Sequence, residues 1–325
     1  MIPKAELHVH LEGAAPPDLV CRLAERNGLQ LSEDLFDERG AFVWNNFLHF
    51  LKVYDEAAAV IRTPQDYRDV TYEYLQACAG EGAVYVEVMS SPDHAAEAGM
   101  SYQDHADGIV AGIDDARRDF AIEGRLIVTC VRHFGVEQAM EVARQVVANP
   151  HPYIVGFGMG GDEAAWPPAQ FRPVFEYVAA SGLPSTVHAG EWAGPDMIRE
   201  AIDSLPVQRI GHGVRACEDP ALLRELADRG ITLEVCPGSN IATGIYPSRQ
   251  AHPLQKLRNA GVKVTLNSDD PPYFATSVGR EYDGAAREMG LTSGDLRGIT
   301  ATAIAAAFVD DTTKCELRRR AGLTD

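Results

Sequence analysis

Short runs of valine, isoleucine and leucine recur along the chain, separated by longer segments in which apolar residues return every three or four positions. The first pattern is typical of strands buried on both faces, and the second of helices that cover such strands. After an opening apolar stretch at 5–13, the short runs lie at 83–89, 125–131, 153–159, 184–189, 207–212, 231–236 and 262–268. Helical patterns separate them, for example at 102–120, 136–148, 173–181, 197–204 and 220–229.

Eight strands that each precede helical sequence predict a parallel sheet closed into a (β/α)8 TIM barrel. The alternative is a doubly wound open sheet, but no Gly-x-Gly-x-x-Gly follows the first strand, as the dinucleotide-binding form of that fold requires. We therefore predict a single α/β barrel domain over residues 1–325.

Extra helices are predicted outside this repeating pattern. After the first strand, one helix opens at Pro16-Pro17, a second carries an apolar face over 47–58, and a third begins at Thr63-Pro64. The apolar face at 47–58 is either part of the core or a lid over a pocket, and we interpret residues 14–82 as a helical lid insertion. The sequence beyond Thr292 is also helical in pattern and is expected to pack outside the barrel.

Composition limits the classes of protein to which the chain can belong. Its 29 basic and 47 acidic residues give a net charge of −18, which would repel nucleic acids and anionic membrane surfaces. Hydrophobic residues make up 46%, enough for a large core, yet no apolar run is long enough to span a membrane. The six cysteines show no disulfide spacing and the first residues no secretory pattern, so a cytoplasmic protein is expected. Nothing in the sequence indicates an oligomeric state.

Chemically active residues cluster where the predicted strands end. In barrels of this kind the catalytic groups lie at the carboxyl ends of the strands. In chain order these ends carry His8 and His10, Glu87, Arg132-His133, Gly160-Gly161-Asp162-Glu163, His188 with Glu191, His212, Cys236-Pro237 and Asp269-Asp270. The histidines at 49, 94, 105, 151 and 252 lie elsewhere and are interpreted as ordinary.

Four of these residues, His8, His10, His188 and Asp269, are predicted to bind one metal ion. His8 and His10 are two apart, so on a strand they point to the same side; a half-buried strand with alternating histidines is the plain alternative. Three imidazoles and a carboxylate suit Zn²⁺, and Fe²⁺, Co²⁺ or Mn²⁺ would tolerate the same ligands. No lysine lies on a middle strand to bridge a second metal. The ion would lower the pKa of water and supply hydroxide near neutral pH.

Two further residues are suited to proton transfer. Glu191, in His-Ala-Gly-Glu, could protonate a ring nitrogen or a leaving group, and His212 could orient the hydroxide or take its proton. Asp270, beside Asp269, would face the substrate. The structural alternatives are a core histidine at position 212 and a helix N-cap formed by the aspartate pair before Pro271-Pro272.

Taken together, these motifs resemble the adenosine deaminase family of metal-dependent amidohydrolase barrels. They occur in family order across nearly the whole chain: Glu-Leu-His-Val-His-Leu-Glu-Gly at 6–13, Phe-Leu-His-Phe at 47–50, Tyr-Val-Glu-Val at 85–88, Gly-Gly-Asp-Glu at 160–163, His-Ala-Gly-Glu at 188–191, Arg-Ile-Gly-His-Gly at 209–213, Glu-Val-Cys-Pro at 234–237 and Asn-Ser-Asp-Asp-Pro-Pro at 267–272.

The resemblance implies a role for each matching residue. Zinc would be bound by His8, His10, His188 and Asp269; Glu191 would protonate purine N1 and His212 would position the hydroxide. Asp270 would contact N7, Gly161 would contact N3, and His10 and Glu12 would approach the sugar side, with Phe47, Phe50 and Leu51 in an apolar lid. The implied reaction is hydrolytic deamination of adenosine or 2′-deoxyadenosine to the inosine product and ammonia.

Departures from the family pattern leave the substrate open. Met89-Ser90 and Gly158-Met159 replace common family pairs, and Glu12 replaces an aspartate of the animal enzymes. Adenine deaminases and aminofutalosine-type deaminases share the metal motifs, so adenine or another 6-aminopurine is the alternative substrate. The run at 272–282 looks more like the nucleoside branch, and on that ground the nucleoside is our main prediction.

Other classes of protein fit less well. Nucleic-acid base deaminases also use zinc, with His-x-Glu and Pro-Cys-x-x-Cys motifs, but no second cysteine follows Cys236 at that spacing. Another hydrolase on the same barrel remains an alternative, and Glu191 argues for purine deamination. A non-enzymatic relative would be expected to have lost a ligand.

Overall fold

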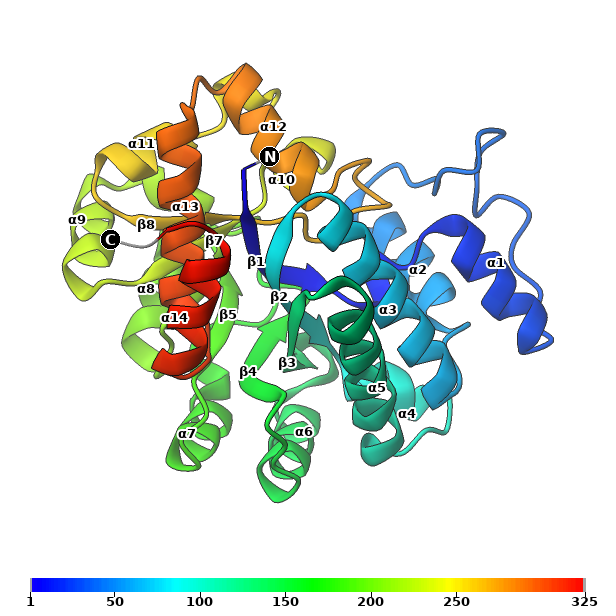
Figure 1. Cartoon of the computed structure of the whole chain (residues 1–325). Coiled ribbons are helices and arrows are strands. Elements are labelled where there is room, and N and C mark those ends of the chain that lie inside the picture. Colours follow the sequence, from blue (N-terminus) through cyan, green and yellow to red (C-terminus); the bar gives the residue numbers. More distant parts are fainter. Residues whose placement is uncertain (1, 324–325) are drawn as a thin grey trace.

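The fold is built on eight parallel strands in the predicted order (Figure 1). The computed structural model describes residues 2–323, apart from the side chains of residues 47 and 48. The strands are β1 (Lys4–His10), β2 (Ala83–Ser90), β3 (Glu123–Val131), β4 (Ile154–Gly160), β5 (Thr186–Ala189), β6 (Arg209–His212), β7 (Thr232–Val235) and β8 (Lys263–Leu266).

Two sheets of four strands, β1–β4 and β5–β8, together form the (β/α)8 barrel. Isolated parallel bridges join them at both seams: Phe157 of β4 pairs with Ser185, and Val9 of β1 pairs with Asp269. The backbone N–H of Phe157 donates to the Pro184 carbonyl at 3.0 Å, and that of His10 donates to the Asp269 carbonyl at 2.9 Å. The predicted fold class is therefore confirmed, and the second seam passes directly through the predicted metal ligands.

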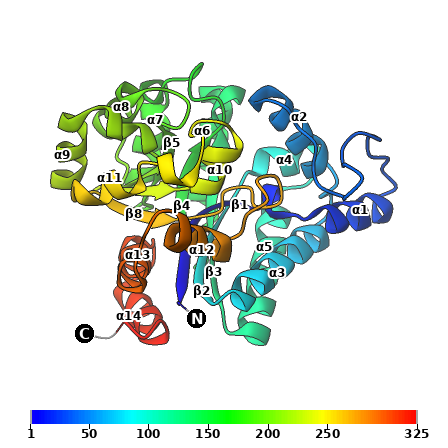
Figure 2. The same cartoon turned by 90° about the horizontal axis from the view of Figure 1, so that it is seen from above.

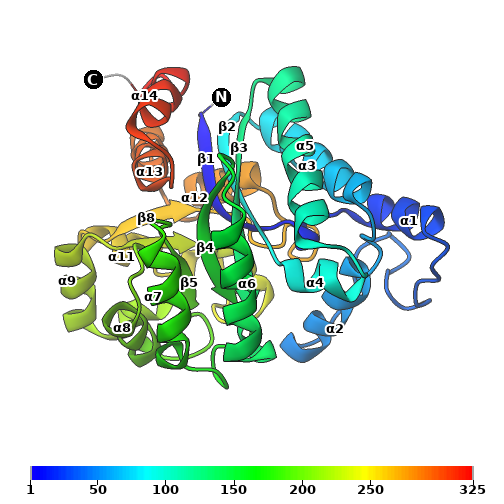
Figure 3. The same cartoon turned by 90° about the horizontal axis from the view of Figure 1, so that it is seen from below.

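Helices surround the strands on all sides (Figures 2 and 3). They are α1 (Pro17–Arg26), α2 (Phe47–Ala58), α3 (Pro64–Gly80), α4 (Pro92–Glu97), α5 (Tyr102–Phe120), α6 (Val136–Ala148), α7 (Arg172–Ala180), α8 (Pro195–Ser204), α9 (Pro220–Arg229), α10 (Pro237–Ala242), α11 (Leu254–Asn259), α12 (Val278–Glu288), α13 (Ser293–Ala306) and α14 (Asp311–Arg320). The ranges predicted at 102–120, 136–148 and 220–229 match α5, α6 and α9. Helices α4 and α10 have six residues each, too few to display a helical period.

Local sequence determines where the helices between β1 and β2 begin. Thr63 caps α3 through its hydroxyl, which accepts a hydrogen bond from the Asp66 backbone N–H. The Asp66 carboxylate in turn accepts a hydrogen bond from the Thr63 backbone N–H. This capping box and Pro64 at the first helical position are the predicted start signals. Asn46 caps α2 in the same manner, accepting from the backbone of His49.

The C-terminal helices pack against the outside of the barrel beside the start of β1, as predicted (Figure 1). A separate buried cluster joins Ala5, Leu7 and Tyr85 of the strands to Ala303 of α13 and Leu317 of α14. All six cysteines are free. Over residues 2–323, no helix combines the length and the apolar character that crossing a bilayer requires.

Candidate active site

Strands β1, β5 and β8 bring the four predicted metal ligands together at one end of the barrel. His8 and His10 lie on β1, His188 lies on β5, and Asp269 follows β8. His10 Nε2 lies 3.1 Å from His188 Nε2 and 3.4 Å from Asp269 Oδ1, and His8 Nε2 lies 3.4 Å from the same oxygen. One ligand atom from each of the four residues lies within 4.8 Å of the others.

The spacing and hydrogen bonding of these groups fit a divalent metal ion. Zinc bonds of about 2.1 Å place neighbouring ligand atoms about 3.0 to 3.4 Å apart, which matches the separations above. His8 Nδ1 donates to Glu234 Oε2 at 2.8 Å and His188 Nδ1 donates to the Met159 carbonyl at 3.0 Å, so each ring turns an Nε2 lone pair inward. His8 Nε2 is buried without a hydrogen-bond partner among the described residues, as a metal-binding nitrogen would be. Burial also lowers the pKa of His10 to about 4, which keeps that imidazole neutral.

A second set of ligand atoms, from His8, His212, Cys236 and Asp269, also lies within 4.8 Å. Cys236 Sγ donates to the Glu234 carbonyl oxygen at 3.5 Å, and burial raises the pKa of this thiol well above its ordinary value. Metals bind the thiolate form of cysteine, so Cys236 is poorly suited as a ligand. The set that contains His10 and His188 fits a metal better.

A bulge in β1 lies beside the first histidine. The three steps from Glu6 to Val9 pair with only two steps of β2, from Val86 to Val88, so β1 carries one extra residue. Such a residue bends a strand and changes the direction of its side chains. The sequence analysis assumed a regular strand here. His8 and His10 nevertheless lie close together, with 5.4 Å between their ring centroids.

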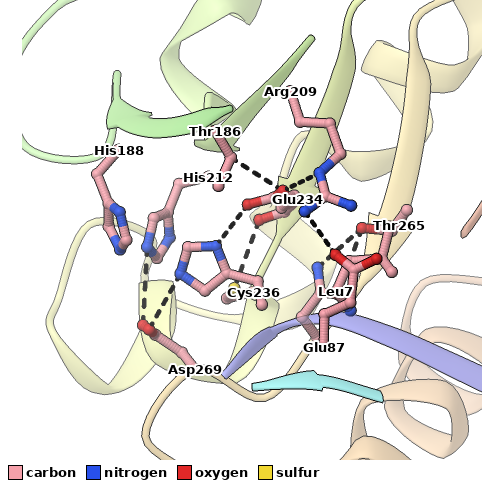
Figure 4. A network of polar contacts seen from close by, with 12 residues as sticks. Leu7, Glu87, Thr186, His188, Arg209, His212, Glu234, Cys236, Thr265 and Asp269 are labelled. Atoms are coloured by element: carbon pink, nitrogen blue, oxygen red, sulfur yellow. Dashed lines mark hydrogen bonds and ion pairs between the residues drawn. The ribbon is translucent and has the colours of Figure 1, made fainter. Parts of the chain in front are cut away.

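A buried ionic network behind His8 was not predicted (Figure 4). Arg209 lies between two carboxylates, with Nη2 2.7 Å from Glu87 Oε2 and Nε 2.6 Å from Glu234 Oε1. Glu234 thereby connects the guanidinium to the His8 ring. Buried charges need such partners, and a carboxylate bonded to a ligating histidine fixes the orientation of the ring. The only sequence signal was a single charged residue inside each of three apolar strands.

The prediction that Glu87 lies with the catalytic groups is wrong. β2 continues to Ser90, so Glu87 is inside the strand rather than at its end. Its Oε1 accepts from the backbone N–H of Phe308, between α13 and α14, at 2.7 Å. Its carboxylate therefore points to the C-terminal helices and the Arg209 network, away from the cavity.

A cavity of about 110 Å³ opens beside the ligand set. Residues from seven of the eight strand ends and from α2 border it, and they include His10, Glu12, Phe50, Leu51, Gly161, His188, Glu191, His212, Asp269 and Asp270. The structure thus brings together the predicted metal, proton-transfer and substrate residues. The side chain of Phe47, also predicted to contact substrate, lies outside the described residues.

Glu191 and His212 face each other at this cavity. His212 Nε2 lies 3.6 Å from Glu191 Oε2 and 3.7 Å from Asp269 Oδ2. Burial, together with the charges of Asp269 and Glu163, raises the pKa of Glu191 well above the usual carboxyl value, so this group can hold a proton near neutral pH. His212 also borders the cavity.

The backbone is strained where two of these strands end. His212 has φ of 58° and Asp269 has φ of 66°, in the left-handed region that non-glycine residues rarely adopt. Such conformations cost about 1 to 3 kcal/mol and concentrate at functional sites. The strain turns both side chains toward the cavity. The helix N-cap alternative for Asp269-Asp270 is wrong, because no helix begins at Pro271 and α12 starts only at Val278.

Arg132 and Glu163, predicted among the strand-end residues, support the loop that carries Glu191. Arg132 is fully buried, and its Nη2 donates to the His188 carbonyl at 2.6 Å. Glu163 accepts from the backbone N–H of Ala193. Together they fix the backbone on both sides of Glu191.

Residues interpreted as ordinary hold Glu12 on another wall of the cavity. Glu12 Oε1 accepts from Ser90 Oγ at 2.5 Å and from Tyr67 Oη at 3.3 Å, and Ser90 Oγ also bonds His105 Nε2 at 2.7 Å. His94 borders the cavity as well. His94 and His105, which were interpreted as ordinary, thus lie on the cavity wall and behind it. Both lie on helices, where a search of strand ends could not find them.

Asp270 lies directly over the backbone of Gly13. A Cβ at position 13 would lie 1.8 Å from Asp270 Oδ1 and 2.8 Å from Tyr54 Cε2. We expect Gly13→Ala to displace Asp270 and Tyr54 from the cavity wall and to raise KM at least about tenfold, or about 1.4 kcal/mol. Steady-state kinetics would measure this, with Gly80→Ala as the control because a Cβ there meets open space. An unchanged KM in Gly13→Ala would contradict the close approach.

The barrel and its ligand set define a metal-dependent amidohydrolase. The sequence model of the adenosine deaminase family matches residues 3–321, and the chain belongs to this family of hydrolytic deaminases.

Individual members of this family and solved structures are similar to the chain over nearly its whole length. An adenine deaminase of Chelativorans sp. (strain BNC1) is 47% identical over 320 residues, which cover 98% of each chain. The crystal structure of adenine deaminase from Arthrobacter aurescens is similar with a TM-score of 0.93 and 32% identity, covering 99% of this chain and 98% of that one. An amidohydrolase from Burkholderia ambifaria, solved with bound Zn, has a TM-score of 0.90 and 29% identity, covering 99% and 90%. Two of these three relatives are named adenine deaminases.

Proposed function

We propose that this protein is a zinc-dependent adenine deaminase that converts adenine and water to the 6-oxopurine and ammonia. One observation carries the proposal: Glu191, Gly161 and Asp270, three groups that can donate hydrogen bonds, border one cavity beside the metal ligands. Adenine presents lone pairs at N1, N3 and N7. Glu191 in its protonated form, the N–H of Gly161 and protonated Asp270 would each donate to one of them. Burial and the adjacent Asp269 charge raise the pKa of Asp270 well above its ordinary value, which favours its donor form.

Glu12 supports a free base rather than a nucleoside. Oε1 already accepts two hydrogen bonds, and the described residues provide no donor to Oε2. A carboxylate can only accept, and free adenine carries a ring N–H that can donate to it. In a nucleoside that nitrogen is bonded to the sugar. A nucleoside would have to satisfy the Glu12 acceptor through a sugar hydroxyl instead of a ring N–H.

In the proposed chemistry four residues hold the metal and Glu191 carries out the proton transfers. His8, His10, His188 and Asp269 would hold the metal, which when bound lowers the pKa of water enough to supply hydroxide near neutral pH. Glu191 gives its proton to N1 as the hydroxide adds to C6. The Glu191 carboxylate then takes the new hydroxyl proton and passes it to the amine. Ammonia leaves, the C6 carbonyl forms, and the proton released by the water restores Glu191.

Residues 14–82 would act as the lid of this site. Phe50 and Leu51 of α2 border the cavity and contribute apolar surface opposite the reactive groups. Excluding water from the closed cavity would strengthen the interactions of Glu191 and Asp270 with the purine.

Ammonia release from a panel of purines tests the proposal. We expect the zinc-loaded protein to act on adenine with a kcat/KM at least about 100-fold above that for adenosine, 2′-deoxyadenosine and N6-methyladenosine, because an analogue that leaves a buried polar group unpaired is strongly rejected. Zinc-loaded Glu191→Gln protein serves as the blank. A kcat/KM for any of these nucleosides equal to or above that for adenine would contradict the assignment. It would favour the prediction of a nucleoside deaminase.

A further inference from the structure

A buried hydrogen-bond chain runs from the start of α11 to His212. The backbone N–H of Leu254 lies 3.2 Å from His252 Nδ1, His252 Nε2 lies 3.2 Å from Asn240 Oδ1, and Asn240 Nδ2 lies 3.2 Å from His212 Nδ1. The three side chains are buried, with exposed fractions of 6% for His252, 0% for Asn240 and 1% for His212. No part of this chain was anticipated, because His252 was interpreted as ordinary.

Elementary donor and acceptor rules give the chain a single direction. The Leu254 N–H can only donate, so His252 Nδ1 must accept and the ring proton of neutral His252 must be on Nε2. Nε2–H needs an acceptor, so the carbonyl oxygen of Asn240 faces it. The amide nitrogen of Asn240 therefore faces His212, and since that nitrogen can only donate, His212 Nδ1 must accept. The amide orientation of Asn240 thus follows from the donors and acceptors on either side of it.

We propose that Asn240 and His252 are positioning residues that hold neutral His212 in the tautomer with its proton on Nε2. This is the nitrogen that lies 3.6 Å from Glu191 Oε2 and borders the cavity. In this tautomer His212 Nε2–H donates a hydrogen bond to an oxygen nucleophile. Nε2 then has no lone pair with which to accept the proton of the nucleophile. His212 could orient the hydroxide or take its proton. The hydrogen-bond chain through Asn240 favours the first of these roles. This consequence rests on the proposed deaminase function, whereas the tautomer does not.

The surroundings of His252 keep the chain in its neutral form. Burial lowers the pKa of His252 to about 3, with a smaller contribution from the Arg249 charge. A protonated His252 would point an Nδ1–H at the Leu254 N–H and break the first link. The Tyr246 ring packs against His252 with 5.1 Å between ring centroids and closes that side of the chain to solvent.

Long-range ¹H–¹⁵N NMR of zinc-loaded protein with ¹⁵N-labelled histidine tests the tautomer directly. The spectrum distinguishes rings protonated on Nε2 from those protonated on Nδ1, and the signals lost in His212→Gln identify residue 212. We expect wild-type His212 to carry its proton on Nε2, as His252 does. A proton on Nδ1 of His212 would overturn the proposal whatever the activity of the enzyme. An Nε2 proton in a protein inactive on every purine would support the tautomer and contradict the proposed function.

Substitutions of Asn240 test the functional consequence. Asn240→Asp has nearly the same shape, but its carboxylate only accepts, so His212 should gain a proton on Nδ1. Inverting a histidine tautomer in a serine protease lowers kcat about 10⁴-fold, and we expect a fall of at least about tenfold here with KM little changed. Ser239→Ala is the matched control, since that buried hydroxyl has no partner among the described residues. Full kcat in Asn240→Asp protein whose His212 carries its proton on Nδ1 and none on Nε2 would overturn the donor role of His212.

A conservative variant separates positioning from packing. His252→Gln keeps an N–H that can donate to Asn240 Oδ1, whereas His252→Phe fills the space without a donor. We expect His252→Gln to retain the Nε2 tautomer of His212 and most of kcat, and His252→Phe to lose both. Equal behaviour of the two variants would contradict the proposal. If either variant does not fold, the wild-type spectrum still decides the tautomer.

Discussion

Replacing Glu191 with glutamine is expected to lower kcat by about 10²- to 10⁴-fold, the usual contribution of a general acid or base. Glutamine keeps the shape of the side chain but cannot give a proton to N1 or carry one to the departing amine. The variant should bind as much metal as the wild type, because Glu191 is not among the four ligands. Stopped assays of ammonia release, with metal analysis of the same samples, would measure both quantities.

The control for this experiment is Glu218→Gln. Glu218 is an exposed carboxylate paired with Arg215, and such a pair contributes at most about 1 kcal/mol to stability. We expect this variant to keep normal turnover. Near-normal turnover in Glu191→Gln protein would remove Glu191 as the acid. Loss of metal from it would show that the substitution disturbs the ligands instead.

The pH dependence of kcat/KM in the wild-type enzyme also tests the role of Glu191 as an acid. Glu191 works in its protonated form, so activity should fall as the pH rises through its pKa. Burial, and then the Asp269 and Glu163 charges, move that pKa well above the usual carboxyl value. The alkaline loss of kcat/KM that depends on Glu191 should therefore occur at a higher pH than for an ordinary glutamate.

Removing the metal is expected to abolish turnover, and adding Zn²⁺ should restore it. Dialysis against a chelator would leave three imidazoles and one carboxylate converging without a cation, and water would keep its ordinary acidity. Because the ion binds the folded state, its removal should also lower the stability, by about 4 kcal/mol if the free metal had been at about 1,000 times its Kd. Thermal unfolding with and without Zn²⁺ would measure the second effect.

A ligand variant and a matched control make this test specific. His188→Ala should reduce the metal content and the turnover together. His151→Ala removes a histidine outside the site, whose Nδ1 accepts from the Tyr153 backbone, and should affect neither. Full activity of the metal-free protein would refute the role of the ligand set.

The elements and the position of the site follow from local sequence. Apolar runs and helical periods identify all eight strands and most long helices, since those patterns reflect which faces are buried. Once the strands close into a barrel, their carboxyl ends must meet, and His8, His10, His188 and Asp269 can be grouped without coordinates. The error at Glu87 arose because this residue, three positions before the last residue of β2, was counted among the strand-end residues and the direction of its side chain was inferred from that.

The sequence by itself determined the barrel, through the alternation of strands and helices, and identified the four candidate ligands and Glu191, because each of these lies in a short motif at a strand end. Only the tertiary structure decided what supports them: Arg209 between Glu87 and Glu234, Ser90 and His105 behind Glu12, and Asn240 with His252 behind His212. Some of these partners lie more than a hundred residues apart in the sequence, so no local periodicity could predict that they meet. Their contacts exist because packing brings buried polar atoms within reach of partners that are distant in sequence, and that is a property of the whole fold.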